Sequence, residues 1–129
     1  MSRLYMLKPA QGYAGITDAV VETVKLAGSR PCPPVYVGVG IGGTFDHCAF
    51  LAKKALTRDV GANSSDAELA EMEKTLLQRI NGLNIGCQGF HGNTTAIGVA
   101  IEKAPTHIAG LPVAVNIKCH CVRCVKEEI

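Results

Sequence analysis

The sequence has no tryptophan, and aromatic residues make up only 5% of its 129 residues. Proteins that bind single-stranded nucleic acids stack the bases on aromatic side chains, which this composition supplies poorly. The formal net charge of +2 is too small to indicate attraction to a phosphate backbone. We therefore expect no nucleic-acid partner.

Long apolar segments are also missing. The longest apolar run, Val35 to Ile41, has the length of a β-strand and includes two glycines. A membrane-spanning helix needs about 20 consecutive apolar residues. The first residues of the chain lack the apolar core of a secretory signal. We therefore expect a cytoplasmic protein with no membrane partner.

Cysteine, in contrast, is well represented, with six residues. Disulfides are rare in a reducing cytoplasm, so cysteines there are more often metal ligands, catalytic thiols or small buried side chains. Apolar residues make up 47% of the chain, which is typical of an ordered domain with a core. The cysteines are therefore the first candidates for a functional site.

The order of the expected elements predicts an α/β fold. Three segments have apolar residues at helical spacing, and three short, nearly uncharged segments are rich in β-branched residues. The expected helices are 17–26, 45–58 and 66–82, with Thr17, Thr44 and Ser65 as capping residues, and the expected strands are 35–41, 94–101 and 111–117. Residues 1–15 are expected to be irregular, because proline and glycine interrupt them. We expect helices layered on a small mixed sheet, as one domain or part of one over residues 1–129.

A glycine-rich segment, Gly38 to Thr44, lies between an expected strand and an expected helix. Its spacing is close to the G-x-G-x-x-G pattern of dinucleotide-binding proteins, but no acidic residue follows at the end of a second strand. Three interpretations remain open: nucleotide binding, tight packing of a strand on a helix, and a turn whose N–H groups hold a carboxylate.

A second motif, C-x-C-x-x-C, is formed by Cys119, Cys121 and Cys124. Three thiolates within six residues can bind a soft metal ion. A structural zinc site would need a further ligand, from Cys32 or Cys87. The motif therefore indicates either a non-catalytic metal-binding module or, as we prefer, one ligand cysteine beside small buried thiols.

Taken together, the motifs resemble one known family. They look like the alpha-type region of class I fumarate hydratases and L-tartrate dehydratases. The resemblance extends over essentially the whole chain, and the order of the motifs makes it specific. The matching segments are Lys8-Pro9-Ala10 with Gly12, Pro31-Cys32-Pro33-Pro34, Gly40 to Thr44, Leu51 to Leu56, Ile85 to Gly89 with Thr94-Thr95, Pro105 to Ala109, and Leu111 to Asn116 leading into Cys119-His120.

The resemblance implies a hydro-lyase that adds or removes water on a small dicarboxylate, fumarate/malate or tartrate/oxaloacetate. In that family three cysteines hold a 4Fe-4S cluster, and one iron without a protein ligand takes the substrate. By resemblance, Cys32 and Cys119 are the second and third cluster ligands, and His107 contacts the substrate. We expect Gln88 to be a further donor to the substrate. An open iron is a Lewis acid and is exposed to oxidants, so we expect oxygen sensitivity.

The sequence departs from the family in three ways. The family's first cluster cysteine belongs to an upstream Ala-Cys-Gln-Asp-Thr-Gly type motif, which is not found here. We therefore expect this chain to be the C-terminal part of an alpha-type region and to be inactive alone. We expect it to work in an oligomer with the upstream segment and a beta-type partner. The general base would come from the upstream segment or from that partner. Cys121 and Cys124 stand where the family usually has Ala and His, and an alternative is that they replace the missing ligand. Cys87 stands where Pro is common.

Overall fold

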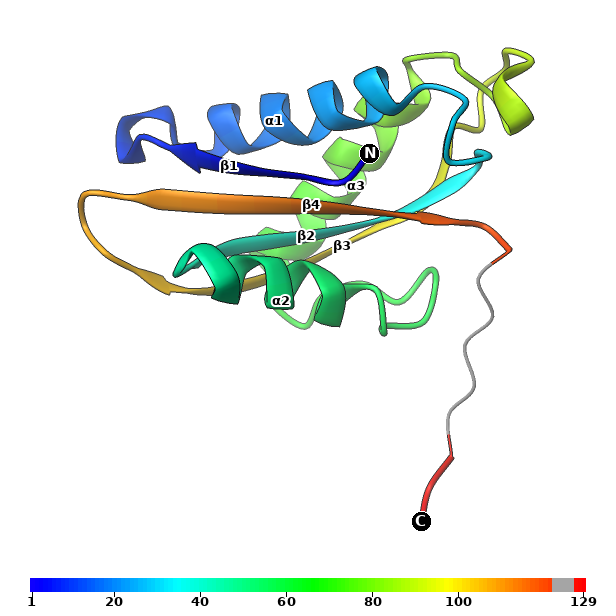
Figure 1. Cartoon of the computed structure of the whole chain (residues 1–129). Coiled ribbons are helices and arrows are strands. Elements are labelled where there is room, and N and C mark those ends of the chain that lie inside the picture. The colour runs from blue at the N-terminus through cyan, green and yellow to red at the C-terminus, as the bar shows by residue number, and fades with distance from the viewer. Residues whose placement is uncertain (122–126) are drawn as a thin grey trace.

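The computed structural model describes residues 1–121 and 127–129. In these residues, three α-helices and two short 3-10 helices accompany a four-stranded sheet, which confirms the predicted mixed α/β fold (Figure 1). None of the described helices is both long and apolar enough to cross a membrane. The elements are β1 (Arg3–Leu7), η1 (Pro9–Gln11), α1 (Gly12–Ala27), β2 (Val35–Gly43), α2 (Phe45–Ala55), α3 (Ala67–Asn81), η2 (Cys87–Gly89), β3 (Ala96–Thr106) and β4 (Leu111–Cys119).

The sheet has the strand order β1-β4-β2-β3. Strands β2 and β3 are parallel, and β4 is antiparallel to both of its neighbours. At one end Val35 of β2 pairs with Cys119 of β4, and we call this the cysteine end. At the other end Gly43 pairs with Thr106, and we call this the turn end. The two ends hold different sets of predicted site residues.

Helices cover both faces of the sheet. α1 and α3 lie on one face and α2 lies on the other (Figure 1). The main core lies between the sheet and the first pair of helices, and includes Val20, Val37 and Val115. On the other face α2 approaches β2 closely, since a Cβ atom at Gly40 would lie 2.0 Å from the Cys48 carbonyl oxygen. The structure thus supports the packing interpretation of the glycine-rich segment.

The prediction that residues 1–15 are irregular was wrong. They form the edge strand β1, the short helix η1 and the first turn of α1. β1 is held by pairing with β4, which is distant in sequence, while Leu4 packs under α2 and Tyr5 packs under α1. Thr17 is not a helix cap but lies inside α1, where its hydroxyl donates to the Tyr13 carbonyl at 2.8 Å.

The other boundaries agree more closely with the sequence. Thr44 is the N-cap residue of α2 as predicted, although its hydroxyl donates to the Asp46 carboxylate at 2.6 Å. The N-cap of α3 is Asp66 rather than Ser65, because the Asp66 carboxylate accepts two backbone N–H groups at 3.0 and 3.3 Å. Both β3 and β4 continue beyond their predicted ends.

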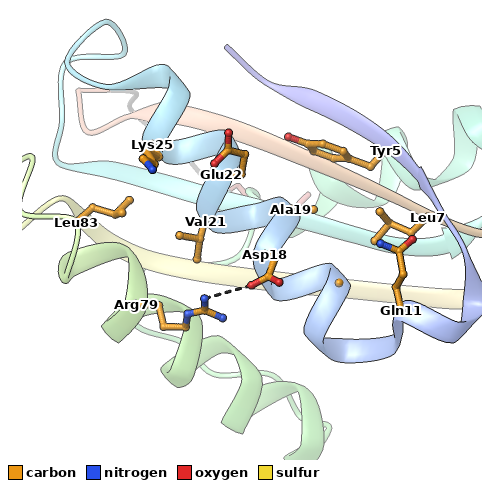
Figure 2. Close-up of a pocket in the computed structure, with 11 residues that line it drawn as sticks. Tyr5, Leu7, Gln11, Asp18, Ala19, Val21, Glu22, Lys25, Arg79 and Leu83 are labelled. Carbon is orange, nitrogen blue, oxygen red and sulfur yellow. Dashed lines mark hydrogen bonds and ion pairs between the residues drawn. The ribbon is translucent and has the colours of Figure 1, made fainter.

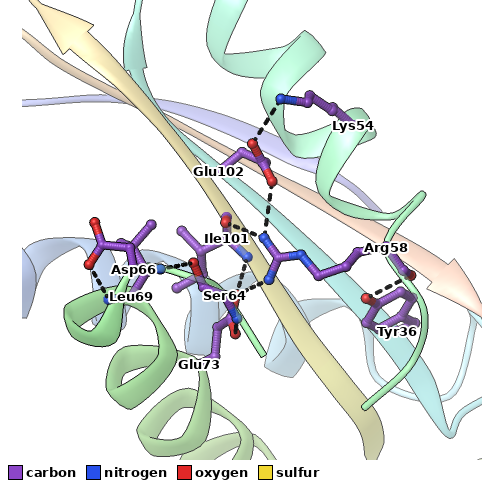
Figure 3. Close-up of polar contacts among 9 residues, drawn as sticks. All are labelled: Tyr36, Lys54, Arg58, Ser64, Asp66, Leu69, Glu73, Ile101 and Glu102. Atoms are coloured by element: carbon purple, nitrogen blue, oxygen red, sulfur yellow. Dashed lines mark hydrogen bonds and ion pairs between the residues drawn. The ribbon is translucent and has the colours of Figure 1, made fainter. Parts of the chain in front are cut away.

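A buried ionic network joins the loop after α2 to β3 and α3 (Figure 3). The guanidinium of Arg58 contacts Glu73 at 2.5 Å and Glu102 at 3.0 Å. Burial lowers the pKa of Arg58, but the hydrogen bonds to both carboxylates outweigh burial and raise it. The second oxygen of Glu73 accepts the backbone N–H of Ser64 at 3.0 Å. The network therefore fixes the loop that runs past the cysteine end.

Candidate functional site

The loop between α1 and β2 presents Cys32 at the surface. Its backbone φ is +54°, a conformation that residues other than glycine adopt rarely. The backbone N–H of Cys32 donates to the Ser29 carbonyl at 3.0 Å, and flanking prolines restrict the chain on both sides. Strained backbone of this kind is concentrated at functional sites, which makes the exposed thiol a candidate ligand.

The glycine-rich loop around η2 lies against the Cys32 loop. Gln88 also has a positive φ, +56°, and its backbone N–H donates to the Pro33 carbonyl at 2.7 Å. The Gln88 side-chain amide donates to the same carbonyl at 3.4 Å. Only glycine fits at position 89, because a Cβ atom there would lie 2.4 Å from the Ser29 Cβ. The two loops are therefore held together, and Gln88 lies beside the predicted ligand Cys32.

The end of β4 completes this group of residues. The Cys119 thiol points to the Cys32 carbonyl oxygen at 3.7 Å, although the two residues are 87 positions apart. The ring N–H of His120 at Nδ1 donates to the same carbonyl at 3.0 Å. The sulfur of Cys121 lies 3.2 Å from the sulfur of Cys119. The fold thus brings Cys32, Gln88 and Cys119 together at the cysteine end.

The surroundings of Cys119 favour its thiolate form. The backbone N–H and the thiol of Cys121 lower the pKa of the Cys119 thiol, with smaller contributions from His120 and Cys32. The pKa of the Cys121 thiol is raised, first by its hydrogen bond to Cys119 and then because a thiolate at Cys119 would repel a second one. Thiolates are the metal-binding form of cysteine, so Cys119 is the better prepared ligand of the two.

A cavity of about 210 Å³ lies next to these residues. It is lined by Cys119 and His120, by the aromatic ring of Tyr36, and by the cationic side chains of Arg58 and Lys118. The carboxylate of Asp59 lines it as well, and the charge of Arg58 is balanced by Glu73 and Glu102. Because Arg58 belongs to the buried network, that network also shapes one wall of this cavity.

The donor set fits part of an iron–sulfur site. Thiolates are the usual ligands of such clusters, and Cys32 and Cys119 lie together at the protein surface. Among the described residues, however, no three side chains of His, Cys, Asp or Glu form a group that could hold a metal ion. Cys124, one candidate for a replacement ligand, lies outside the described residues. A cluster here would need a further ligand in addition to these two cysteines.

His107 lies at the opposite end of the sheet, in the turn between β3 and β4. Its Nδ1 atom accepts the backbone N–H of Ala109 at 3.1 Å. Strand β4, whose nine residues end at Cys119, lies between His107 and that cysteine and spans roughly 26 Å at about 3.3 Å per step. The turn of the glycine-rich segment is also at this end, since the Thr106 hydroxyl donates to the Gly43 carbonyl at 3.2 Å. A single chain therefore does not bring His107 to the cysteines.

The two remaining described cysteines differ in accessibility. Cys48 is fully buried in α2, where burial raises the pKa of its thiol and its Sγ contacts the Phe45 carbonyl at 3.2 Å. Cys87 is exposed, and its sulfur lies 3.9 Å from the Thr94 carbonyl oxygen. Cys48 is thus a core residue, while Cys87 is an accessible thiol near the cysteine end.

A larger cavity of about 540 Å³ lies between α1 and α3 (Figure 2). An ion pair between Asp18 and Arg79, at 3.2 Å, crosses it. None of the site residues predicted from the sequence lines this cavity. Its size alone does not make it the functional site.

Comparison with known proteins agrees with the resemblance inferred from the motifs. Residues 1–128 match the family described as fumarate hydratase (Fumerase). The chain belongs to the fumarate hydratase family. A putative L(+)-tartrate dehydratase subunit alpha of Methanocaldococcus jannaschii is 52% identical over 119 residues, covering 92% of this chain and 42% of that protein. The L(+)-tartrate dehydratase subunit alpha of Escherichia coli K12 is 38% identical over 117 residues, covering 91% and 39%.

This member of the fumarate hydratase family is thus similar to only a part of each relative. It spans about two fifths of the length of these relatives: the matched region is 42% of the first relative and 39% of the second. The fold brings the Cys119 thiol to the backbone carbonyl of Cys32 within the part of the chain that matches the family.

Proposed function

We propose that this chain supplies two cysteine ligands, Cys32 and Cys119, to a 4Fe-4S cluster in a hydro-lyase. The proposed reaction is the reversible hydration or dehydration of a small dicarboxylate, fumarate/malate or tartrate/oxaloacetate. The contact between the Cys119 thiol and the backbone carbonyl of Cys32 at 3.7 Å carries this proposal, because it brings together two cysteines that are 87 positions apart. Membership of the fumarate hydratase family supports it.

The chemistry explains why such a site would use soft ligands and a Lewis acid. Elimination of water breaks a bond to hydroxide, a poor leaving group, and removes a weakly acidic proton. A bound cluster with one open iron would supply the Lewis acid that stabilises the departing oxygen. Within the chain, His120 fixes the Cys32 carbonyl, and Gln88 is held beside Pro33, from where we propose that it donates to a substrate carboxylate.

We retain His107 as a proposed substrate contact, with a geometric condition. Since β4 separates His107 from Cys119 within one chain, His107 would meet the substrate only if a second copy brought its turn end to these cysteines. This condition agrees with the expected oligomer. If the chain acts without such a neighbour, His107 has no part in the same site.

We propose further that the chain is the C-terminal part of an alpha-type region and acts in the cytoplasm with the upstream segment and a beta-type partner. The relatives are named as alpha subunits, which supports a partner subunit. The upstream segment would provide the third cysteine, and the general base would lie outside this chain. The chain alone is therefore expected to show no turnover with fumarate, malate or tartrate.

Anaerobic purification of the complete enzyme tests the ligand assignment. Cys32→Ser and Cys119→Ser are each expected to lose iron, sulfide and the visible absorbance of the cluster. Cys87→Ser is the matched control, because Cys87 is an exposed thiol near the same end of the sheet, and it should keep them. Full iron and sulfide in either ligand variant would contradict the proposal.

The same preparation tests the alternative of a non-catalytic metal-binding module. The 3.2 Å contact between the sulfurs of Cys119 and Cys121 is the observation that favours this alternative. Stoichiometric zinc that survives exposure to air, without iron, would support it and would count against the hydro-lyase.

A further inference from the structure

The turn after β4 places two thiols in contact. The sulfur atoms of Cys119 and Cys121 are 3.2 Å apart, about 1.2 Å more than the ~2.05 Å length of a disulfide bond. We propose that these two residues are a redox modification site, a dithiol that closes reversibly to a disulfide when Cys119 carries no metal. In this role Cys121 is the resolving cysteine for Cys119.

The neighbouring contacts hold this geometry in place. Cys119 is fixed by its pairing with Val35 in the sheet. The next residue, His120, is fixed by the bond from its ring N–H to the Cys32 carbonyl at 3.0 Å. With Cys119 and His120 held in place, the Cys121 sulfur needs to move only about 1.2 Å toward Cys119 to close the bond.

Contact between the two sulfur atoms, rather than exposure, distinguishes this pair, since Cys32 and Cys87 are exposed as well. Cys121 is exposed and Cys119 is partly exposed, so a small oxidant reaches them. Cys48 is buried in α2, and the sulfur of Cys87 lies against the Thr94 carbonyl. Within the described part of the chain, Cys119 and Cys121 are the one pair whose sulfur atoms are in hydrogen-bond contact.

A low-molecular-weight disulfide such as glutathione disulfide is the proposed oxidant. One protein sulfur attacks it, forms a mixed disulfide and releases one small thiol. The second protein sulfur then attacks the first, so that one protein S–S bond forms and a second small thiol leaves. Two electrons pass from the protein to the small disulfide, and the two protein thiol protons end on the two released thiols. An excess of reduced thiol reverses both steps.

The proposed disulfide does not depend on the proposed function, but its effect on metal binding by Cys119 does. A sulfur in a disulfide is no longer a thiolate, so the closed pair excludes ligation of iron by Cys119. The closed pair also keeps Cys119 at a reversible oxidation level, because further oxidation to sulfinic acid is irreversible in most proteins. Cys121, which stands where the family usually has Ala, would thus protect a metal ligand in the metal-free protein.

The disulfide is tested on the metal-free chain with glutathione disulfide, alkylation of free thiols and mass spectrometry of the C-terminal peptide. Cys124→Ser removes the third thiol of the motif. In this variant we expect Cys119 and Cys121 to become resistant to alkylation together, with a peptide lighter by two hydrogens. Cys87→Ser should behave as wild type. Cys121→Ser should instead keep glutathione on Cys119.

Two results would overturn the inference. In Cys124→Ser, both thiols of the pair could remain open to alkylation, or Cys119 could be linked to Cys32 instead. Treatment with peroxide followed by a reductant adds a second readout: Cys121→Ser should accumulate irreversibly oxidised Cys119, and wild type should not. If the pair closes but Cys119→Ser still loads a cluster, the proposed function fails and the modification site stands. If the pair stays open but the cluster needs Cys119, the modification site fails and the proposed function stands.

Discussion

Replacing Glu73 by alanine should destabilise the fold by about 3–5 kcal/mol. Its carboxylate is only 4% exposed and binds the Arg58 guanidinium at 2.5 Å (Figure 3). It also accepts the backbone N–H groups of Ile101 at 2.8 Å and Ser64 at 3.0 Å. Alanine would leave a partly buried cation and two backbone donors without this acceptor, and each unsatisfied buried donor costs about 1–3 kcal/mol.

Glu71 provides a matched control on the same helix. Its side chain is 74% exposed and makes one surface ion pair, with Lys74 at 3.7 Å. Glu71→Ala changes helix propensity in α3 in the same way as Glu73→Ala, but should cost only about 0–1 kcal/mol. Glu73→Gln keeps the size of the side chain and loses its charge, so its effect should lie between the two.

Urea unfolding followed by circular dichroism measures these differences. With a slope of about 1–3 kcal/mol per molar urea, Glu73→Ala should lower the midpoint by about 0.7 M or more relative to Glu71→Ala. If Glu73→Ala does not fold, Glu73→Gln should still show a lowered midpoint. Equal midpoints for Glu71→Ala and either Glu73 variant would refute the stabilising role of the network.

Two further predictions concern packing and pH. Gly40→Ala should destabilise the protein by about 1–3 kcal/mol or more, because its Cβ would lie 2.0 Å from a backbone oxygen of α2. Gly110→Ala is the control: its Cβ would meet no atom within 4 Å, so thermal unfolding should be nearly unchanged. For Glu102, burial raises the carboxyl pKa, but hydrogen bonds from Arg58 and Lys54 outweigh burial and lower it. The ionised Glu102 carboxylate therefore stabilises the folded state above the unfolded pKa of 4.5, and this contribution is lost as the pH falls through the lower folded pKa. The loss of stability caused by Glu102→Gln at pH 7 should thus become smaller on acidification. If the free energies of unfolding of wild type and Glu102→Gln differed by the same amount at every pH, this prediction would be contradicted.

The sequence predicted elements whose signals are local. The buried strand β2 and the helices α2 and α3 follow from β-branched runs, periodic apolar residues and capping side chains. β1 was missed because its five residues depend on pairing with β4, more than 100 positions away in the register Arg3 to Val115. Nothing within those five residues specifies this partner.

The buried network was missed as well, although a signal for part of it exists. Glu73 lies on the apolar stripe of α3 that includes Leu69, Leu76 and Ile80, and all four are buried. A lone acidic residue on such a stripe predicts a buried cationic partner. That this partner is Arg58, from the loop after α2, depends on the tertiary fold.

The sequence proposed members of the candidate site but did not predict their arrangement. The resemblance named Cys32, Gln88 and Cys119, and the fold brings their loops into contact. It also named His107, only 12 positions before Cys119 in the sequence. These positions are occupied by a turn and an extended strand, which carry the two residues to opposite ends of the sheet.

The most direct measurement of the central claim is a crystal structure of the complete enzyme, grown without oxygen and measured at the iron absorption edge. We predict anomalous iron density bonded to the sulfurs of both Cys32 and Cys119, with a further thiolate ligand from a third cysteine. Iron bonded to neither sulfur, or a metal held by Cys119 and Cys121 without Cys32, would contradict the account.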